Sequence, residues 1–155
     1  MTLAMALTMA LTTACTAPER QADRTANPLT DPTRQPEYLA GIDRLAALNT
    51  EARAHFAAGR RSQAAALVTE GKDIAKELLE VSRPNLAAME AVADRDEIYA
   101  DLLFANRHFA HARQMHQRNV ARWKHWLPQT DETRRRLGLA EAAIQRCDQA
   151  LAAER

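Results

Sequence analysis

The sequence predicts an all-α protein, and three features lead to that fold class. Residues that favour helices are abundant, whereas only 4 of the 155 residues are glycine. Apolar residues recur three and four positions apart, the spacing that places them on one helical face. Breaks at Gly59, Pro84, Arg107 and Pro128 divide this pattern into five segments. We therefore expect a short solenoid of two antiparallel helix hairpins plus a C-terminal capping helix, with a closed five-helix bundle as the alternative.

The first two helices are expected on either side of Gly59, which suits the left-handed residue that follows a helix. The first helix begins at Pro36. The second begins at about Ser62, a candidate N-cap, and ends before Pro84. Their apolar stripes consist of Tyr38, Ile42, Leu45, Ala52 and Phe56, followed by Leu67, Ile74, Leu78 and Val81.

The stretch 98–126 is predicted to hold a tight antiparallel helix pair, because only the corner 106–108 joins its two halves. The third helix is expected to start at Pro84, which a first turn tolerates, with Ser82 as its candidate cap. The fourth runs from Phe109 to Trp126. Their stripes consist of Leu86, Met89, Val92, Tyr99, Leu102 and Leu103, followed by Ala112, Met115, Val120 and Trp123.

The fifth helix is expected to open at Thr130, with Asp131 and Glu132 in a first turn that favours negative charge. Its apolar residues alternate three and four apart and form a narrow seam, as in a helix that covers the end of a stack. Cys147 belongs to this seam and is expected to be a small buried hydrophobe. The seam consists of Leu137, Ala140, Ile144, Cys147 and Leu151.

The first seventeen residues carry no charge, and the apolar run is shorter than the roughly 20 residues that span a bilayer. Residues 1–14 are therefore predicted to be a signal peptide. The stretch from Leu11 to Cys15 resembles the lipobox of bacterial lipoproteins, which implies that Cys15 is lipidated and becomes the mature N-terminus. Thr16 then implies an outer-membrane destination facing the periplasm; the alternative is a soluble periplasmic protein. Residues 15–36 contain four prolines and no apolar period, so they are expected to be a flexible linker before a folded domain at 37–155.

Two parts of the domain share one spacing. Ala52, Phe56, Gly59 and Ala64 can be laid over Ala100, Phe104, Arg107 and Ala112, 48 residues further on. In both, a small residue and an aromatic precede a corner, and a second small residue follows it. This pattern resembles the tetratricopeptide repeat, and residues 112–140 are similar to the longer variety of the repeat found in kinesin light chains.

The resemblance implies a non-catalytic scaffold that binds a protein or peptide partner in a groove lined by the first helix of each pair. Recognition of this kind relies on a few polar groups for orientation and on apolar anchors for affinity. The expected partner-binding residues are Asn49, Arg53, Phe56, Glu97, Asp101 and Phe104.

Charge is unevenly distributed, although the formal net charge is only +1. Among the charged residues, acids outnumber bases in residues 70–101, and bases outnumber acids in residues 107–136. The simpler interpretation is that these helices lie side by side in weak surface ion pairs. The other is an anionic-partner patch, for phosphate-rich envelope glycans or an acidic protein face; an exported protein rarely meets nucleic acid, so no nucleic-acid partner is expected. The patch would contain Arg118, Arg122, Lys124, Arg134, Arg135 and Arg136.

No catalytic or metal site is expected. His108, His111 and His116 are close in sequence, but Arg107 and Arg113 beside them would repel a cation. No serine stands beside a plausible base, and no cofactor motif is present. Two alternatives to the scaffold stay open. One is a structural or stress-related envelope lipoprotein that self-associates, with Trp126 and Cys147 at its oligomer surface. The other is a small ligand- or metal-binding helical bundle.

Overall fold

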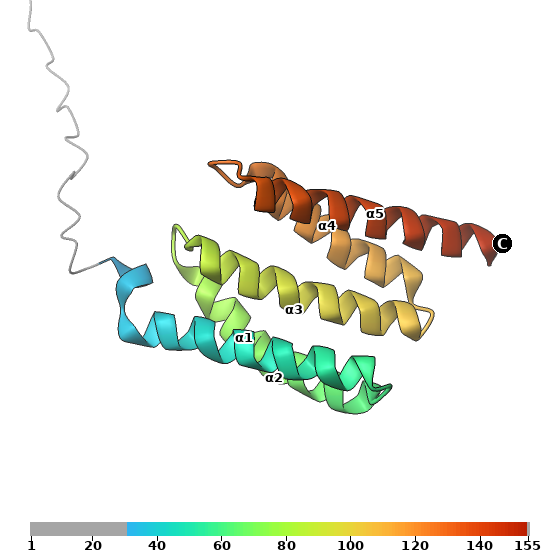
Figure 1. Ribbon diagram of the computed structural model, residues 1–155, viewed down its shortest axis with the longest axis horizontal. Coiled ribbons are helices and arrows are strands. Elements are labelled where there is room, and N and C mark those ends of the chain that lie inside the picture. The colour runs from blue at the N-terminus through green and yellow to red at the C-terminus, as the bar shows by residue number, and fades with distance from the viewer. Residues whose placement is uncertain (1–30, 155) are drawn as a thin grey trace, which may run out of the picture.

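The computed structural model describes residues 31–154, and within them the all-α prediction is confirmed, with no β-strand. Five helices follow one another in antiparallel order (Figure 1). The signal peptide, Cys15 and most of the predicted linker lie outside the described residues. The elements are the short 3-10 helix η2 (Pro32–Arg34) and the α-helices α1 (Pro36–Ala57), α2 (Arg61–Glu80), α3 (Leu86–Ala105), α4 (Phe109–His125) and α5 (Asp131–Ala153).

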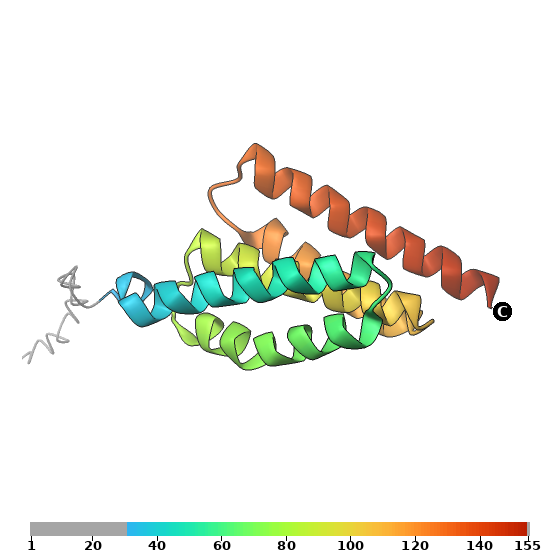
Figure 2. The same ribbon diagram turned by 60° about the horizontal axis from the view of Figure 1, so that its bottom comes forward.

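The helices pack in chain order, as expected for two hairpins followed by a fifth helix. The hairpin α1–α2 packs against α3, α3 packs on its other side against α4, and α5 packs against α4 (Figure 1). A second view shows α5 standing apart from α2 (Figure 2). The central helix α3 is therefore covered on two sides, whereas α1 and α5 each keep one face open to solvent.

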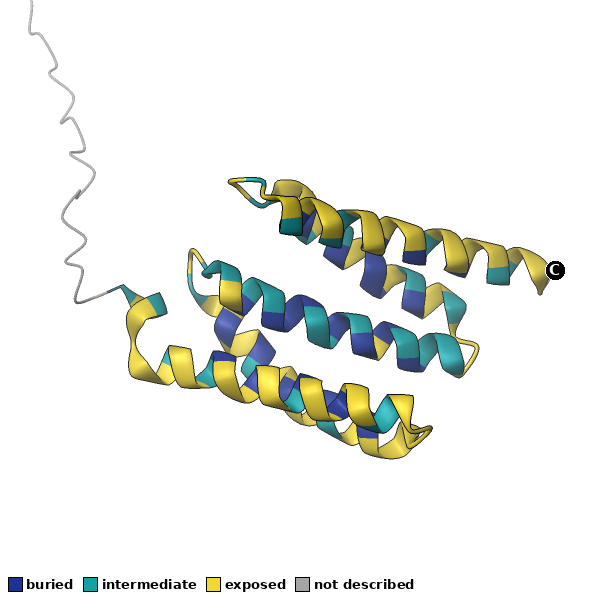
Figure 3. Cartoon of the chain, in the orientation of Figure 1, coloured by how far each residue is buried: buried dark blue, intermediate teal, exposed yellow. Residues whose placement is uncertain are grey.

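The core is a row of three hydrophobic clusters, and buried residues lie on the facing sides of neighbouring helices (Figure 3). The four alanines of the predicted internal repeat are fully buried, and their small side chains allow the helices to approach closely. Gly71 contributes to the same close packing, since a Cβ there would lie 2.8 Å from the Leu45 side chain. The four alanines are Ala52, Ala64, Ala100 and Ala112, each 0% exposed.

Two of the expected caps are wrong. The N-cap of α3 is Asn85, whose side-chain oxygen accepts from the Ala88 backbone N–H at 2.9 Å; Ser82 lies too far upstream to reach these first-turn amides. The second helix begins at Arg61 after Arg60, so Ser62 already lies inside it. The start of α5 matches the expectation, and Thr130 forms a reciprocal capping box with Thr133.

Candidate functional site

A cleft of about 470 Å³ opens between α1, α3, α4 and α5. Its lining combines small and aromatic side chains with charged residues. Leu139 of α5 is 51% exposed in this setting, which makes it the large apolar side chain that an occupant of the cleft would meet. The lining residues are Arg53, Ala93, Asp94, Glu97, His116, Asn119, Trp123, Arg135, Arg136, Leu139, Ala140, Ala142, Ala143 and Arg146.

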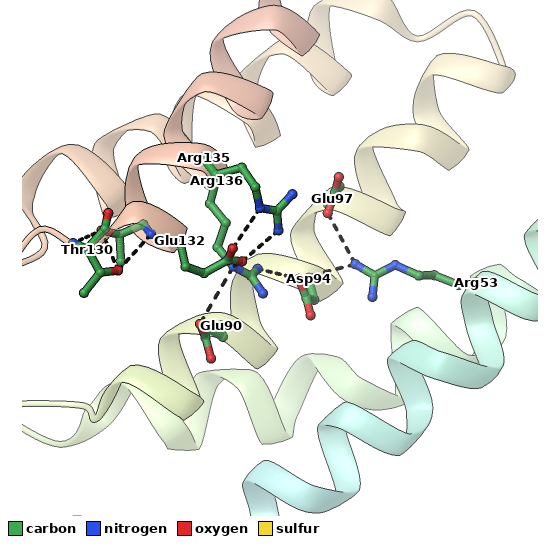
Figure 4. Close-up of polar contacts among 9 residues, drawn as sticks. Arg53, Glu90, Asp94, Glu97, Thr130, Glu132, Arg135 and Arg136 are labelled. Carbon is green, nitrogen blue, oxygen red and sulfur yellow. Dashed lines mark hydrogen bonds and ion pairs between the residues drawn. The ribbon is translucent and has the colours of Figure 1, made fainter.

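The wall from α3 carries carboxylates that already have cationic partners. Asp94 and Glu97 are three residues apart, so they lie on one face of α3. Arg53 of α1 reaches both of them, with its Nη2 at 3.3 Å from Asp94 Oδ1 and 3.3 Å from Glu97 Oε2 (Figure 4). This pair of contacts fixes α1 against α3 beside the cleft.

Arg136 connects α5 to α3 across one end of the cleft. Its Nη1 lies 2.8 Å from Asp94 Oδ1, and its Nε lies 2.8 Å from Glu132 Oε1 and 3.8 Å from Glu90 (Figure 4). The guanidinium also lies over the ring of Trp123, 5.5 Å from the centroid, which is within range of a cation–π interaction. Arg136 is only 20% exposed, so this end of the cleft is closed by a fixed ionic contact.

Glu132 is bound by two arginines on its own helix. Arg135 donates to both of its carboxylate oxygens, at 2.8 and 2.7 Å, and Arg136 donates to one of them (Figure 4). Hydrogen bonds from Arg135, and then from Arg136, lower the pKa of Glu132 to about 2. Both cations at the start of α5 are therefore already paired with carboxylates.

The other end of the cleft is formed where α4 and α5 run antiparallel. Arg107 pairs with Glu154 at 3.0 Å and Arg113 with Asp148 at 2.7 Å, and these two contacts set the register of the helices. His116 lies three residues further along α4, within reach of the charge of Arg146 on α5. Both residues line the cleft.

His116 is a buried imidazole that faces this cleft. It is 3% exposed and makes no hydrogen bond within residues 31–154. All fully buried side-chain nitrogens and oxygens in the described chain are hydrogen-bonded, so the unbonded ring nitrogens of His116 are accessible from the cleft. Burial first, and the charge of Arg146 second, lower the pKa of His116. The neutral imidazole offers one donor and one acceptor to an occupant.

The structure brings two of the six expected partner-binding residues together in the cleft, namely Arg53 and Glu97. Asn49 is buried and donates to the Ala91 carbonyl at 2.8 Å. Phe56 and Phe104 pack against hydrophobic clusters, which places them in the helix interfaces. Asp101 is half-buried beside the cleft, and burial together with the nearby Glu97 charge raises its pKa.

The six residues of the expected anionic patch do not lie on one free surface. Arg122 is 10% exposed and bound to Asp96 at 3.1 Å, and Arg134 pairs with Asp131. Arg135 and Arg136 bind Glu132 at the edge of the cleft. Arg118 and Lys124 are exposed on α4, and Arg118 contacts the Met115 sulfur at 3.8 Å. The ion pairs from α4 and α5 to Asp96 and Asp94 place the acidic and basic helices side by side, but the Arg122–Asp96 pair is buried and not the weak surface pair that was expected.

Sequence reasoning missed the face of α5 that borders the cleft. Leu139, Ala142, Ala143 and Arg146 belong to it, and they follow Arg135 and Arg136 at the three-and-four spacing of one helical face. That spacing was visible in the sequence. The spacing did not predict a cleft, because the apolar seam of α5 predicted a helix with one buried face whose remaining residues are exposed to solvent.

Residues 31–154 contain no group of three or more His, Cys, Asp and Glu side chains arranged to hold a metal ion. His108 and His111 are exposed, with ring centroids 6.4 Å apart, whereas His116 is buried in the cleft.

None of the helices in the part of the chain that the structure describes is long and apolar enough to cross a bilayer.

Comparisons of the chain with protein-family models, curated proteins and solved structures found no significant match. The chemistry of the cleft must therefore be judged from its own residues. Guanidinium groups, an accessible imidazole and an exposed leucine can orient and bind a ligand. Within the cleft lining there is no serine, threonine, cysteine or lysine to act as a nucleophile beside His116.

Proposed function

We propose that this chain is a non-catalytic binding protein whose five-helix domain holds a segment of a protein partner in the cleft between α1, α3, α4 and α5. The observation that carries the proposal is the composition of that cleft. The lining combines an exposed Leu139 and several alanines with charged residues, as in interfaces where an apolar anchor is ringed by polar groups. Most of the charged lining residues are already ion-paired, which keeps them in place for an incoming segment; they are Arg53, Asp94, Glu97, Arg135 and Arg136.

The repeat interpretation supports this role. The helices stack in order, and the four alanines that the tetratricopeptide resemblance assigned to close-packed positions are all fully buried. Repeat modules of this kind present a groove on one side of the stack. We retain the tetratricopeptide-like description as part of the proposal, with α1 and α3 as first helices and α2 and α4 as second helices of two pairs.

The proposed location is the bacterial cell envelope, with Cys15 as a lipid attachment site. This part depends on the uncharged segment 1–14 and the lipobox-like stretch that ends at Cys15. Metabolic labelling with a fatty-acid analogue tests it. We expect label in the full chain and none in Cys15→Ser; equal labelling of both would refute lipidation at this residue.

The binding role is tested by photo-crosslinking in cells. A photoreactive residue at Leu139 reports on the cleft, and one at Gln145, exposed on the same helix but outside the cleft lining, is the matched control. We expect a discrete protein adduct from position 139 that is absent from position 145. Equal labelling at both positions, or no adduct at 139, would rule out the cleft as the binding site.

A further inference from the structure

We propose that the cleft recognises an acidic side chain of its protein partner, which binds between the His116 imidazole and the Arg146 guanidinium. This inference rests on the proposed binding function and adds the chemistry of the partner. The acidic chemistry is inferred from the end of the cleft that holds His116 and Arg146, whose polar groups are available to an occupant. At the other end, the charged groups already bind one another.

Arg146 differs from the other cleft arginines in its partners. Arg53, Arg135 and Arg136 each contact a carboxylate within 4.0 Å, whereas Arg146 has no such ion pair within residues 31–154. Its guanidinium lies 5.9 Å from the centroid of the Phe104 ring. Stacking on an aromatic ring occupies the face of a guanidinium and leaves its in-plane N–H donors for a carboxylate.

His116 supplies the second contact. The residue is 3% exposed, and its ring nitrogens are unbonded within residues 31–154 and accessible from the cleft, so that they can meet a polar group that enters it. Arg146 lines the same cleft, and its charge acts on this imidazole. An oxyanion between them would accept from the arginine and from an imidazole N–H, and its charge would stabilise the imidazolium.

The charges around this end of the cleft favour an anion over a cation. Glu97 is occupied by Arg53, and burial raises the pKa of Asp101. A lysine entering here would face Arg146 and Arg53 and would displace an existing ion pair. A carboxylate would meet an arginine that has no ion pair within 4.0 Å among residues 31–154 and interacts with the Asp101 carboxylate only at longer range. Arg146 is the charged group that acts on His116; Arg53 and Glu97 line the same cleft, and Asp101 of α3 interacts electrostatically with Glu97, Arg146 and Arg53.

The test uses the full chain and two blocked peptides of alanine and leucine that differ only in carrying glutamate or glutamine. Binding is followed at low salt by NMR of the histidine rings, with His116→Gln used to assign the His116 signal. We expect the glutamate peptide to shift that signal and raise the His116 pKa, and to bind about five- to tenfold more tightly than the glutamine peptide. Arg146→Gln should remove this preference, while Arg118→Gln, exposed on α4 outside the cleft, should preserve it.

A third arm with sodium acetate separates a peptide side chain from any free carboxylate. A weaker shift with acetate alone is expected, because the peptide adds apolar contacts to Leu139. Equal affinity for both peptides, a preference that survives Arg146→Gln, or a His116 signal that no probe moves would overturn the proposal. If crosslinking at position 139 still succeeds in that case, the binding function stands and only the acidic chemistry is refuted.

Discussion

Gly59 and Arg107 lie 48 residues apart and adopt the same left-handed backbone conformation, with φ of 75° and 63°. Each is the turn residue of a hairpin, between α1 and α2 and between α3 and α4. The backbone hydrogen bonds of the two corners also correspond. These bonds run from Gly59 N to Phe56 O and from Arg60 N to His55 O, both 2.9 Å, and from Arg107 N to Phe104 O at 2.9 Å and His108 N to Leu103 O at 2.8 Å.

The two corners predict opposite effects of substitution. Gly59→Ala should destabilise the protein by about 1 kcal/mol, because a side chain is strained at positive φ. No atom lies within 4 Å of the added Cβ, so the effect is conformational rather than steric. Arg107→Gly should be neutral or stabilising by up to about 1 kcal/mol. Urea unfolding of both variants measures these changes in the free energy of unfolding.

A control separates backbone strain from the Arg107–Glu154 ion pair at 3.0 Å. Glu154→Gln removes the ion pair without touching the turn, and it should change the unfolding free energy by less than about 1 kcal/mol because Arg107 is exposed. A loss of more than 1 kcal/mol in Arg107→Gly that Glu154→Gln does not reproduce would contradict the equivalence of the corners.

The equivalence of these corners was readable from sequence, because it depends on local spacing. The five helices were predictable for the same reason, since each carries an apolar stripe with a break at its end. The cap at Asn85 was missed because several polar residues precede α3 and spacing alone does not choose between them. The cleft was missed because it depends on how far α5 stands from α3, which is set by the register of α4 against α5 and the reach of Arg136 to Asp94.

Asp96 is the centre of a buried ionic cluster between α2, α3 and α4. Its carboxylate lies 3.1 Å from Arg122 and 3.2 Å from Arg95, and Arg95 donates to the Val68 carbonyl at 3.0 Å. Asp96 and Arg122 are only 8% and 10% exposed. Asp96→Asn would leave two arginines buried without their counter-charge, and we expect a loss of about 3 kcal/mol in unfolding free energy.

Chemical denaturation of Asp96→Asn tests this, with Glu70→Gln as the matched control. Glu70 pairs with Arg44 at 3.0 Å, but both side chains are largely exposed, so its loss should cost less than about 1 kcal/mol. Similar effects of the two substitutions would show that burial of the Asp96 cluster contributes little to stability.

His116 should make stability depend on pH in the mildly acidic range. Burial, and then Arg146, lower its pKa, so the unfolded chain binds a proton at higher pH than the folded one. Stability is therefore retained above the usual histidine pKa of about 6.5 and falls as pH drops below it. We expect the urea midpoint to decrease between about pH 7.5 and about pH 5.5, and His116→Gln to reduce that decrease. An unchanged pH dependence in the variant would exclude His116 as its source.

The exposed side chains of α1 and α5, at the two ends of the helix stack, are mostly polar or small, and the large apolar ones among them are Leu39 of α1 and Leu139 of α5. The residues of α3 that pack on the first hairpin are large and apolar, whereas the residues 48 positions earlier, on the open face of α1, are not. The α3 residues are Val92, Ile98 and Leu102, and their α1 counterparts are Arg44, Thr50 and Ala54, all exposed. At the other end, the exposed residues of α5 include Glu141, Gln145, Asp148 and Gln149.

We therefore expect a monomer, because large apolar side chains are few among the exposed residues at either end. Sedimentation equilibrium of the full chain in Cys15→Ser form, over a wide concentration range, should fit one species of monomer mass. The triple variant Arg44→Val, Thr50→Ile and Ala54→Leu gives α1 the apolar side chains that α3 uses, and it should associate as concentration rises. A defined oligomer of the parent protein would instead favour the self-associating envelope lipoprotein. If neither the parent nor the triple variant associates, the apolar side chains that α3 uses support packing only within its own chain.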